Sequence, residues 1–155
     1  MSRPPRLRAV IGSLVAAFVI AANIFTGCGG DSTSPGPPPD CTSVADTSQP
    51  ATVTYTGQIA ALIDHYACAT AGCHGSIGTR SRYTVVSYDD LFDPGEQATA
   101  LRVCAIRPGM PDSSYFYWKL EGHAGIRGVQ MPNDRPKLTP EHLAMVRTWI
   151  EEGAR

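Results

Sequence analysis

The residues best suited to do chemistry lie in the segment HYACATAGCHGS, residues 65–76, where Cys68 and Cys73 are followed directly by His74. Two cysteines and a histidine in this order are typical of c-type haem attachment, in which the thiols bond the porphyrin and the imidazole binds the iron. The usual spacer between the cysteines holds two residues, whereas this one holds four. Its side chains are small, and its glycine can take a positive φ, so a longer spacer could bulge outward.

The same residues support two other interpretations. Disulfides form readily outside the cytoplasm, so Cys68 and Cys73 could bond to each other and leave His74 as a bystander. A zinc site is a third interpretation, although zinc takes about four ligands and only three candidates lie together here. The motif alone favours neither haem nor a disulfide, and the rest of the chain has to decide.

A haem iron takes an axial ligand on each face, so a second ligand is needed besides His74. Met131 is the first choice, because it is a thioether that precedes a proline in the loop before the last expected helix. Met110 also precedes a proline and is the second choice, and Met145 lies inside that helix. Surface roles are expected for the remaining candidates, His65, His123 and His142.

The first thirty residues predict the compartment. Three arginines precede an apolar run over residues 9–25, and small residues follow up to Cys28, a pattern typical of a secretory signal peptide. The stretch IFTGC is similar to the bacterial lipobox, in which the signal is cut before a cysteine that is then lipidated. We therefore expect a lipoprotein signal peptide over residues 1–27, lipid on Cys28, and an extracytoplasmic chain held at the outer membrane, on its periplasmic or surface side. An uncleaved anchor or a plain secreted protein is the alternative.

The mature chain divides into a linker and one domain. Residues 28–50 are rich in Pro, Ser, Thr and Gly, which predicts a disordered tether. Residues 51–155 have the size of one small domain. After Cys28 the chain has fourteen acidic and ten basic residues, a formal charge of −4. This mild charge does not indicate a nucleic-acid partner.

The elements that must position the motif are helices. An apolar stripe in residues 54–68 predicts a helix that runs into Cys68. Thr139 as N-cap, followed by Pro140, predicts a helix that ends at Gly153. Two shorter helices are expected in SYDDLF and SSYFYWKLEG, whereas FDPGEQ is expected to be a loop and YTVVSY at most a lone strand. The predicted fold class is mostly α, with about four helices and long Gly- and Pro-rich loops.

Six segments resemble, in the same order, the single-domain c-type cytochrome lipoproteins of environmental bacteria, which are related to planctomycete-type domains and to class I cytochromes c. Here they read YTGQIAALIDHYAC, CATAGCHG, VSYDDL, RPGMPDSSYFYWKL, QMP and LTPEHLAMVRTWIEEGA, and they cover nearly all of residues 54–154. The resemblance implies a cytochrome c-like fold with one covalent haem c. Cys68 and Cys73 would form the thioethers, His74 would be the proximal ligand and Met131 the distal one. Met110 falls where the family usually has Asp or Asn.

The resemblance implies an electron carrier with a redox protein as its partner, and not an enzyme. Two other functions stay open: a haem-free lipoprotein stapled by disulfides, with a structural or interaction role, and a sensory or enzyme-associated haem module. Subtracting one cysteine for lipid and two for haem from the total of five leaves Cys41 and Cys104. Unpaired thiols are uncommon outside the cytoplasm, so we predict that these two form a disulfide. A free, buried Cys104 is the alternative.

Overall fold

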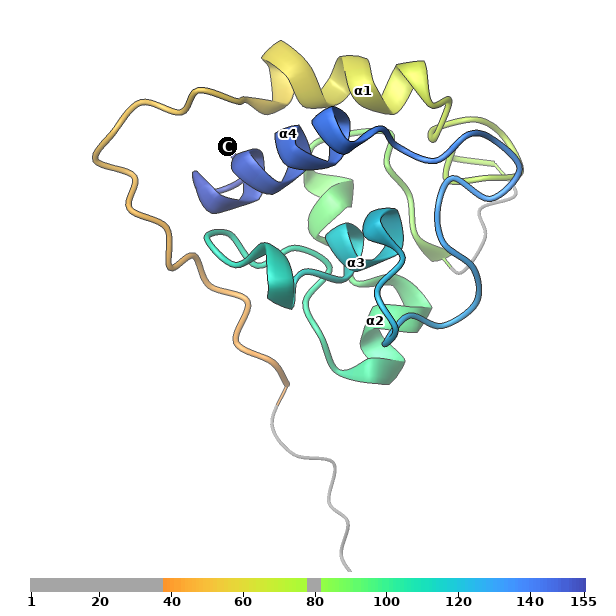
Figure 1. The fold of residues 1–155 in the computed structure, drawn as a ribbon. Helices are drawn as coiled ribbons and strands as arrows, with labels where there is room; N and C mark the ends of the chain where they lie inside the picture. Colours follow the sequence, from red (N-terminus) through yellow and green to blue (C-terminus); the bar gives the residue numbers. More distant parts are fainter. Residues whose placement is uncertain (1–37, 78–81) are drawn as a thin grey trace, which may run out of the picture. The chain divides into compact units, whose positions relative to one another are not determined.

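The computed structural model describes residues 38–77 and 82–155, so the predictions for the signal peptide and for lipid on Cys28 lie outside the described residues. Within these ranges the fold is mostly helical, with four α-helices and no β-strand, which confirms the prediction of a mostly α domain with about four helices (Figure 1). None of the described helices is long and apolar enough to cross a membrane. The elements in chain order are η1 (Tyr55–Ile59), α1 (Ala60–His65), η3 (Asp89–Phe92), α2 (Gly95–Leu101), η4 (Pro111–Ser113), α3 (Tyr115–Glu121) and α4 (Pro140–Glu151).

The first helix begins as expected but ends early. The Thr54 hydroxyl accepts a hydrogen bond from the Gly57 backbone N–H at 3.0 Å and caps the π-helical turn η1, which continues into α1. The helix ends at His65 and does not run into Cys68, because Ala67 takes a φ of 50°, a left-handed conformation that an α-helix cannot contain. The motif therefore starts in a turn that follows the helix.

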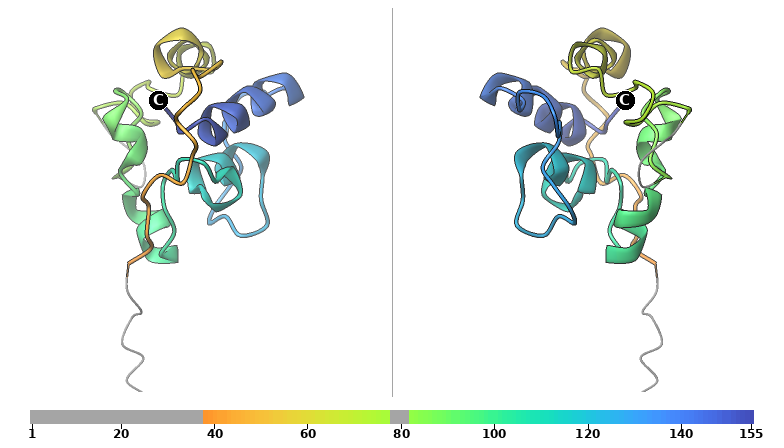
Figure 2. Two further views of the ribbon diagram at one scale, coloured as in Figure 1. Left: turned by 90° about the vertical axis from the view of Figure 1, so that its left-hand side faces the viewer. Right: turned by 90° about the vertical axis from the view of Figure 1, so that its right-hand side faces the viewer.

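The last helix, α4, supplies the centre of the core. The Thr139 hydroxyl accepts from the His142 backbone N–H at 3.3 Å, as the predicted N-cap requires. Val146, Trp149 and Ile150 on one face of α4 are all 0% exposed. This face packs against η1 and α3, so α4 lies between the first helix and α3 (Figures 1 and 2).

The middle of the chain differs from the prediction at one helix. The segment FDPGEQ was expected to be a loop, and that is wrong, since Gly95–Leu101 forms α2. The turn signal is real, because the Asp93 carboxylate accepts from the Gly95 N–H at 3.0 Å, but the turn opens a helix whose Ala98 is fully buried. The two other short helices are present as η3 and as η4 with α3.

Residues 38–50, called the strap below, run along the domain as an extended segment (Figure 1). Cys41 is bonded to Cys104 with a Cα–Cα distance of 5.6 Å, which confirms the predicted disulfide. The Val44 N–H donates to the Pro108 carbonyl at 3.0 Å, and the Arg155 guanidinium donates to the Thr47 carbonyl at 3.1 Å. The strap is thus attached to the domain at several points, although most of its residues are exposed.

Candidate functional site

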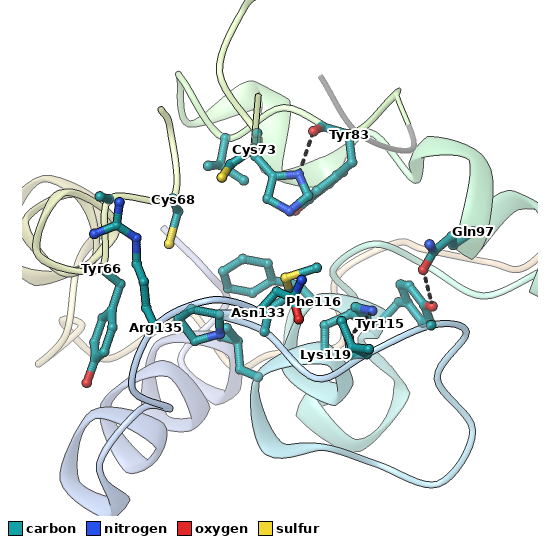
Figure 3. A pocket seen from close by; sticks show the side chains of 18 of the residues that line it. Tyr66, Cys68, Cys73, Tyr83, Gln97, Tyr115, Phe116, Lys119, Asn133 and Arg135 are labelled. Atoms are coloured by element: carbon teal, nitrogen blue, oxygen red, sulfur yellow. Dashed lines mark hydrogen bonds between the residues drawn. The ribbon is translucent and has the colours of Figure 1, made fainter. Parts of the chain in front are cut away.

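A cavity of about 370 Å³ opens between the segment that carries the motif, helix α3 and the loop before α4 (Figure 3). Its wall contains Cys68, Cys73, His74 and Met131, the four residues that the sequence assigned to one site. Cavities of about 300–1,000 Å³ are typical of small-molecule and cofactor sites. Residues separated by more than fifty positions in the chain are therefore brought to one hollow of suitable size.

The long spacer of the motif folds back on itself. The His74 N–H donates to the Cys68 carbonyl at 3.1 Å, and the Cys73 N–H donates to the Thr70 carbonyl at 3.1 Å, so the two ends of the spacer are held close. Gly72 has a φ of 79°, the positive value expected for the bulge. Gly75 after the histidine fits where no side chain would, since a Cβ there would lie 2.7 Å from the carbonyl oxygen of Ala69.

Both cysteines of the motif are free thiols, so the disulfide between them is not formed in this structure. Cys68 is half-buried and Cys73 is exposed. Burial, and then the neighbouring Cys73, raises the pKa of the Cys68 thiol from 9.0 to about 11. A thiol with so high a pKa is almost fully protonated at neutral pH, which slows its oxidation because the thiolate is the reactive form.

His74 has one ring nitrogen held by the protein. Its Nδ1 lies 2.8 Å from the carbonyl oxygen of Tyr83. A carbonyl oxygen only accepts, so Nδ1 must carry a proton and donate, which leaves Nε2 as the nitrogen with the lone pair in the neutral ring. This arrangement is common for metal-binding histidines, in which a hydrogen bond at the far nitrogen fixes the tautomer and the ring orientation.

Tyr83 is a site residue that sequence reasoning missed. Its hydroxyl donates to the Leu91 carbonyl at 3.1 Å, its ring packs edge-on against His74, and burial raises the pKa of its phenol. It lies in YTVVSY, which was considered only as a strand. A backbone carbonyl leaves no mark in the residue types, so the spacing of the sequence could not have revealed this partner.

The two methionine choices lie in different places. Met131 is half-buried in the cavity wall, and its N–H donates to the Lys119 carbonyl at 2.7 Å. Met110 does not line the cavity. It caps the start of η4, where its carbonyl accepts from the Ser114 hydroxyl at 2.9 Å. Met145 packs beside the core on α4 and is also outside the cavity lining.

The three other histidines lie away from the cavity lining. His142 Nδ1 is 2.8 Å from the Tyr66 hydroxyl, and the ring of His65 lies 5.8 Å from that of His142. His123 stacks on Trp118 with ring centroids 4.5 Å apart. His65 and His123 are exposed, as expected, whereas His142 is half-buried through its contact with Tyr66.

The remaining wall of the cavity comes from residues that the sequence did not single out. Phe116 supplies an aromatic surface, and several polar side chains also line the cavity (Figure 3). Besides the tyrosines and the motif itself, the polar and charged members are Gln97, Lys119, Asn133, Asp134 and Arg135. A mostly apolar lining with a few polar and charged groups is typical of sites for small molecules and cofactors.

The donor set fits a haem better than a bare metal ion. Two thiols, an imidazole nitrogen and a thioether are the groups that a covalently attached, His/Met-ligated haem uses. Among residues 38–77 and 82–155 no group of three or more His, Cys, Asp or Glu side chains is placed to hold a metal ion, so a zinc ion has no ligand set there.

Comparisons of the chain with protein-family models, with curated proteins and with solved structures find no match. The chemistry of the cavity wall is therefore what indicates the function.

Proposed function

We propose that this protein is a monohaem c-type cytochrome that carries single electrons outside the cytoplasm and is not an enzyme. The observation that supports this best is that two free thiols, an imidazole with a free Nε2 and a thioether line one cavity. Bound there, the haem would supply a one-electron change at its iron.

Four residues of the cavity wall would hold the haem. The Cys68 and Cys73 thiols would hold the porphyrin covalently as thioethers, and this attachment needs the reduced thiols that the structure has. His74 would bind the iron through Nε2, and the Tyr83 carbonyl would orient the ring and raise its basicity. Met131 would hold the iron through its thioether, and thioether ligation raises the reduction potential.

The proposed location follows from the N-terminal pattern. Lipid on Cys28 would hold the chain at a membrane, and its partner would be another redox protein. Cys28→Ser should abolish incorporation of a clickable fatty acid. Undiminished labelling of that variant would contradict the lipid assignment.

A haem-free, disulfide-stapled lipoprotein is the second candidate. The Cys41–Cys104 bond favours it, since this staple needs no cofactor. It leaves Cys68 and Cys73 unexplained, because two unpaired thiols are uncommon in an extracytoplasmic protein.

An absorption spectrum separates the two candidates. Made together with a cytochrome c maturation system, the protein should show haem bands that sharpen on reduction, and the haem should stay with the chain through acid–acetone extraction. The double variant Cys68→Ala/Cys73→Ala should lose the covalent haem. A folded, colourless wild-type protein would refute the electron-carrier proposal.

The distal ligand has a matched test. Met131→Ala should remove the near-infrared sulfur-to-iron band and lower the reduction potential. Met110→Ala should retain both, because Met110 lies outside the cavity lining. Loss of the band in Met110→Ala alone would reverse the assignment.

A further inference from the structure

The chain contains only two lysines, and both bind the backbone of the same loop. Of its thirteen basic residues, eleven are arginines, and the exceptions are Lys119 and Lys137. Lys119 lies on α3, and Lys137 lies just before α4. Both ammonium groups donate to carbonyls within residues 127–132, called the distal loop below, which carries Met131.

Lys119 holds the distal loop from the side of α3. Its Nζ donates to the Arg127 carbonyl at 3.0 Å and to the Val129 carbonyl at 2.5 Å. Its own carbonyl accepts from the Met131 N–H at 2.7 Å. One residue therefore fixes the loop before Met131 and the backbone of Met131 itself.

Lys137 binds the distal loop on both sides of Met131. Its Nζ donates to the Gln130 carbonyl at 2.9 Å and also to the Pro132 carbonyl. These two carbonyls belong to the residues directly before and after Met131. Together the two ammonium groups bind four of the six carbonyls of the distal loop.

Lysine is well suited to binding several backbone carbonyls of one loop. An ammonium group has three donors on a flexible stem and can gather carbonyls that point in different directions. A guanidinium is a planar fork that matches coplanar acceptors such as carboxylates. In the described part of the chain neither lysine forms an ion pair, whereas Arg82 and Arg147 do.

We propose that Lys119 and Lys137 are positioning residues that clamp the distal loop so that the thioether of Met131 faces the cavity as an iron ligand. The inference rests on the proposed function for the ligand role of Met131. Since Lys119 also lines the cavity, its positive charge favours the less positive, reduced state of a group bound there. The clamp thus fixes the distal ligand and raises the reduction potential.

The test compares Lys119→Met and Lys137→Met with Arg127→Met. The control, Arg127→Met, removes one positive charge from the distal loop itself. The Arg127 guanidinium makes no hydrogen bond within the described residues, so this variant should leave the clamp intact. In the haem-loaded protein both lysine variants should weaken the near-infrared sulfur-to-iron band and lower the reduction potential, and Arg127→Met should keep the band. A full band in both lysine variants would overturn the clamp.

A second readout does not need haem. Amide hydrogen exchange over the distal loop should be about tenfold or more faster in each lysine variant than in Arg127→Met, because charge-assisted hydrogen bonds are lost. Equal exchange in all three variants would refute the clamp. Faster exchange in a protein that never takes up haem would support the clamp and refute the proposed function, so the two failures are distinguishable.

A third readout uses the wild-type chain and guards against variants that do not fold. With only two lysines, an amine-reactive reagent followed by peptide mass spectrometry reports on each clamp group separately. Both lysines should react at least about tenfold more slowly in the folded chain than in urea. Folded-state reaction as fast as in urea would contradict the hydrogen bonds on which the clamp depends.

Discussion

Removing the disulfide between the strap and the domain should cost a large part of the stability. Cys41→Ser is the cleaner perturbation, because Cys41 is exposed and its replacement opens no cavity in the core. Cys104 is 4% exposed, so Cys104→Ala would add a packing loss to the loss of the bond.

The magnitude follows from the loop that the bond closes. The two cysteines are 63 positions apart, and the chain-entropy relation gives roughly 4 kcal/mol for a loop of this length. Without the bond the strap keeps hydrogen bonds such as Val44 N–H to the Pro108 carbonyl and the Arg155 guanidinium to the Thr47 carbonyl. Exposed contacts of this kind contribute about 1 kcal/mol each or less.

Urea unfolding of the wild type and of Cys41→Ser should therefore differ by roughly 4 kcal/mol, which corresponds to a fall in Tm on the order of 10–20 °C for a domain of this size. The strap should also become sensitive to protease in the native state. The matched control is Arg155→Met, which removes strap contacts and keeps the covalent bond. A loss below about 1 kcal/mol in Cys41→Ser, together with alkylatable Cys41 and Cys104 in the wild type, would refute the reasoning.

The remaining predictions concern the cap, the motif and pH. Thr139→Ala should destabilise the domain by about 1 kcal/mol in urea unfolding, because α4 loses its N-cap, and an unchanged midpoint would contradict that role. Gly75→Ala should cost about 1–3 kcal/mol and reduce haem incorporation, because its Cβ would meet the Ala69 carbonyl. Gly72→Ala meets no neighbour, so its cost should come only from the backbone strain of a positive φ. In the haem-free chain, the raised pKa of Cys68 contributes stability that is present below pH 9 and is lost as the pH approaches 11. Cys68→Ala should flatten that fall in urea unfolding, and an unaltered pH profile would argue against a buried thiol.

The parts of the structure that could be predicted from sequence depend on residues near one another in the chain. Thr139, Pro140 and the apolar spacing of α4 can be recognised within a few turns of the chain, so they predict this helix without knowledge of distant contacts. The order Cys68, Cys73, His74 is likewise local, and so is the bulge that Gly72 allows. The Cys41–Cys104 pairing is long-range, and it was predicted because these two cysteines remain once one is assigned to lipid and two to haem.

One local signal was misread. FDPGEQ contains strong turn residues, and the turn forms, but a turn signal does not say whether a helix or a loop follows it. Helix α2 has only seven residues, too few to be stable alone. The burial of Ala98 in the folded domain supplies the stability that so short a helix does not have by itself.

Tertiary structure alone decided which distant groups meet the motif. Met131 and Met110 both precede a proline, and only the folding of the loop before α4 places one of them in the cavity. The Tyr83 carbonyl that orients His74, and the four carbonyls bound by Lys119 and Lys137, are backbone groups that every residue carries. Residue types therefore determined which chemistry the chain offers. The packing of α3, α4 and the loops between them determined which of those groups face one another, because that choice depends on contacts across the whole domain.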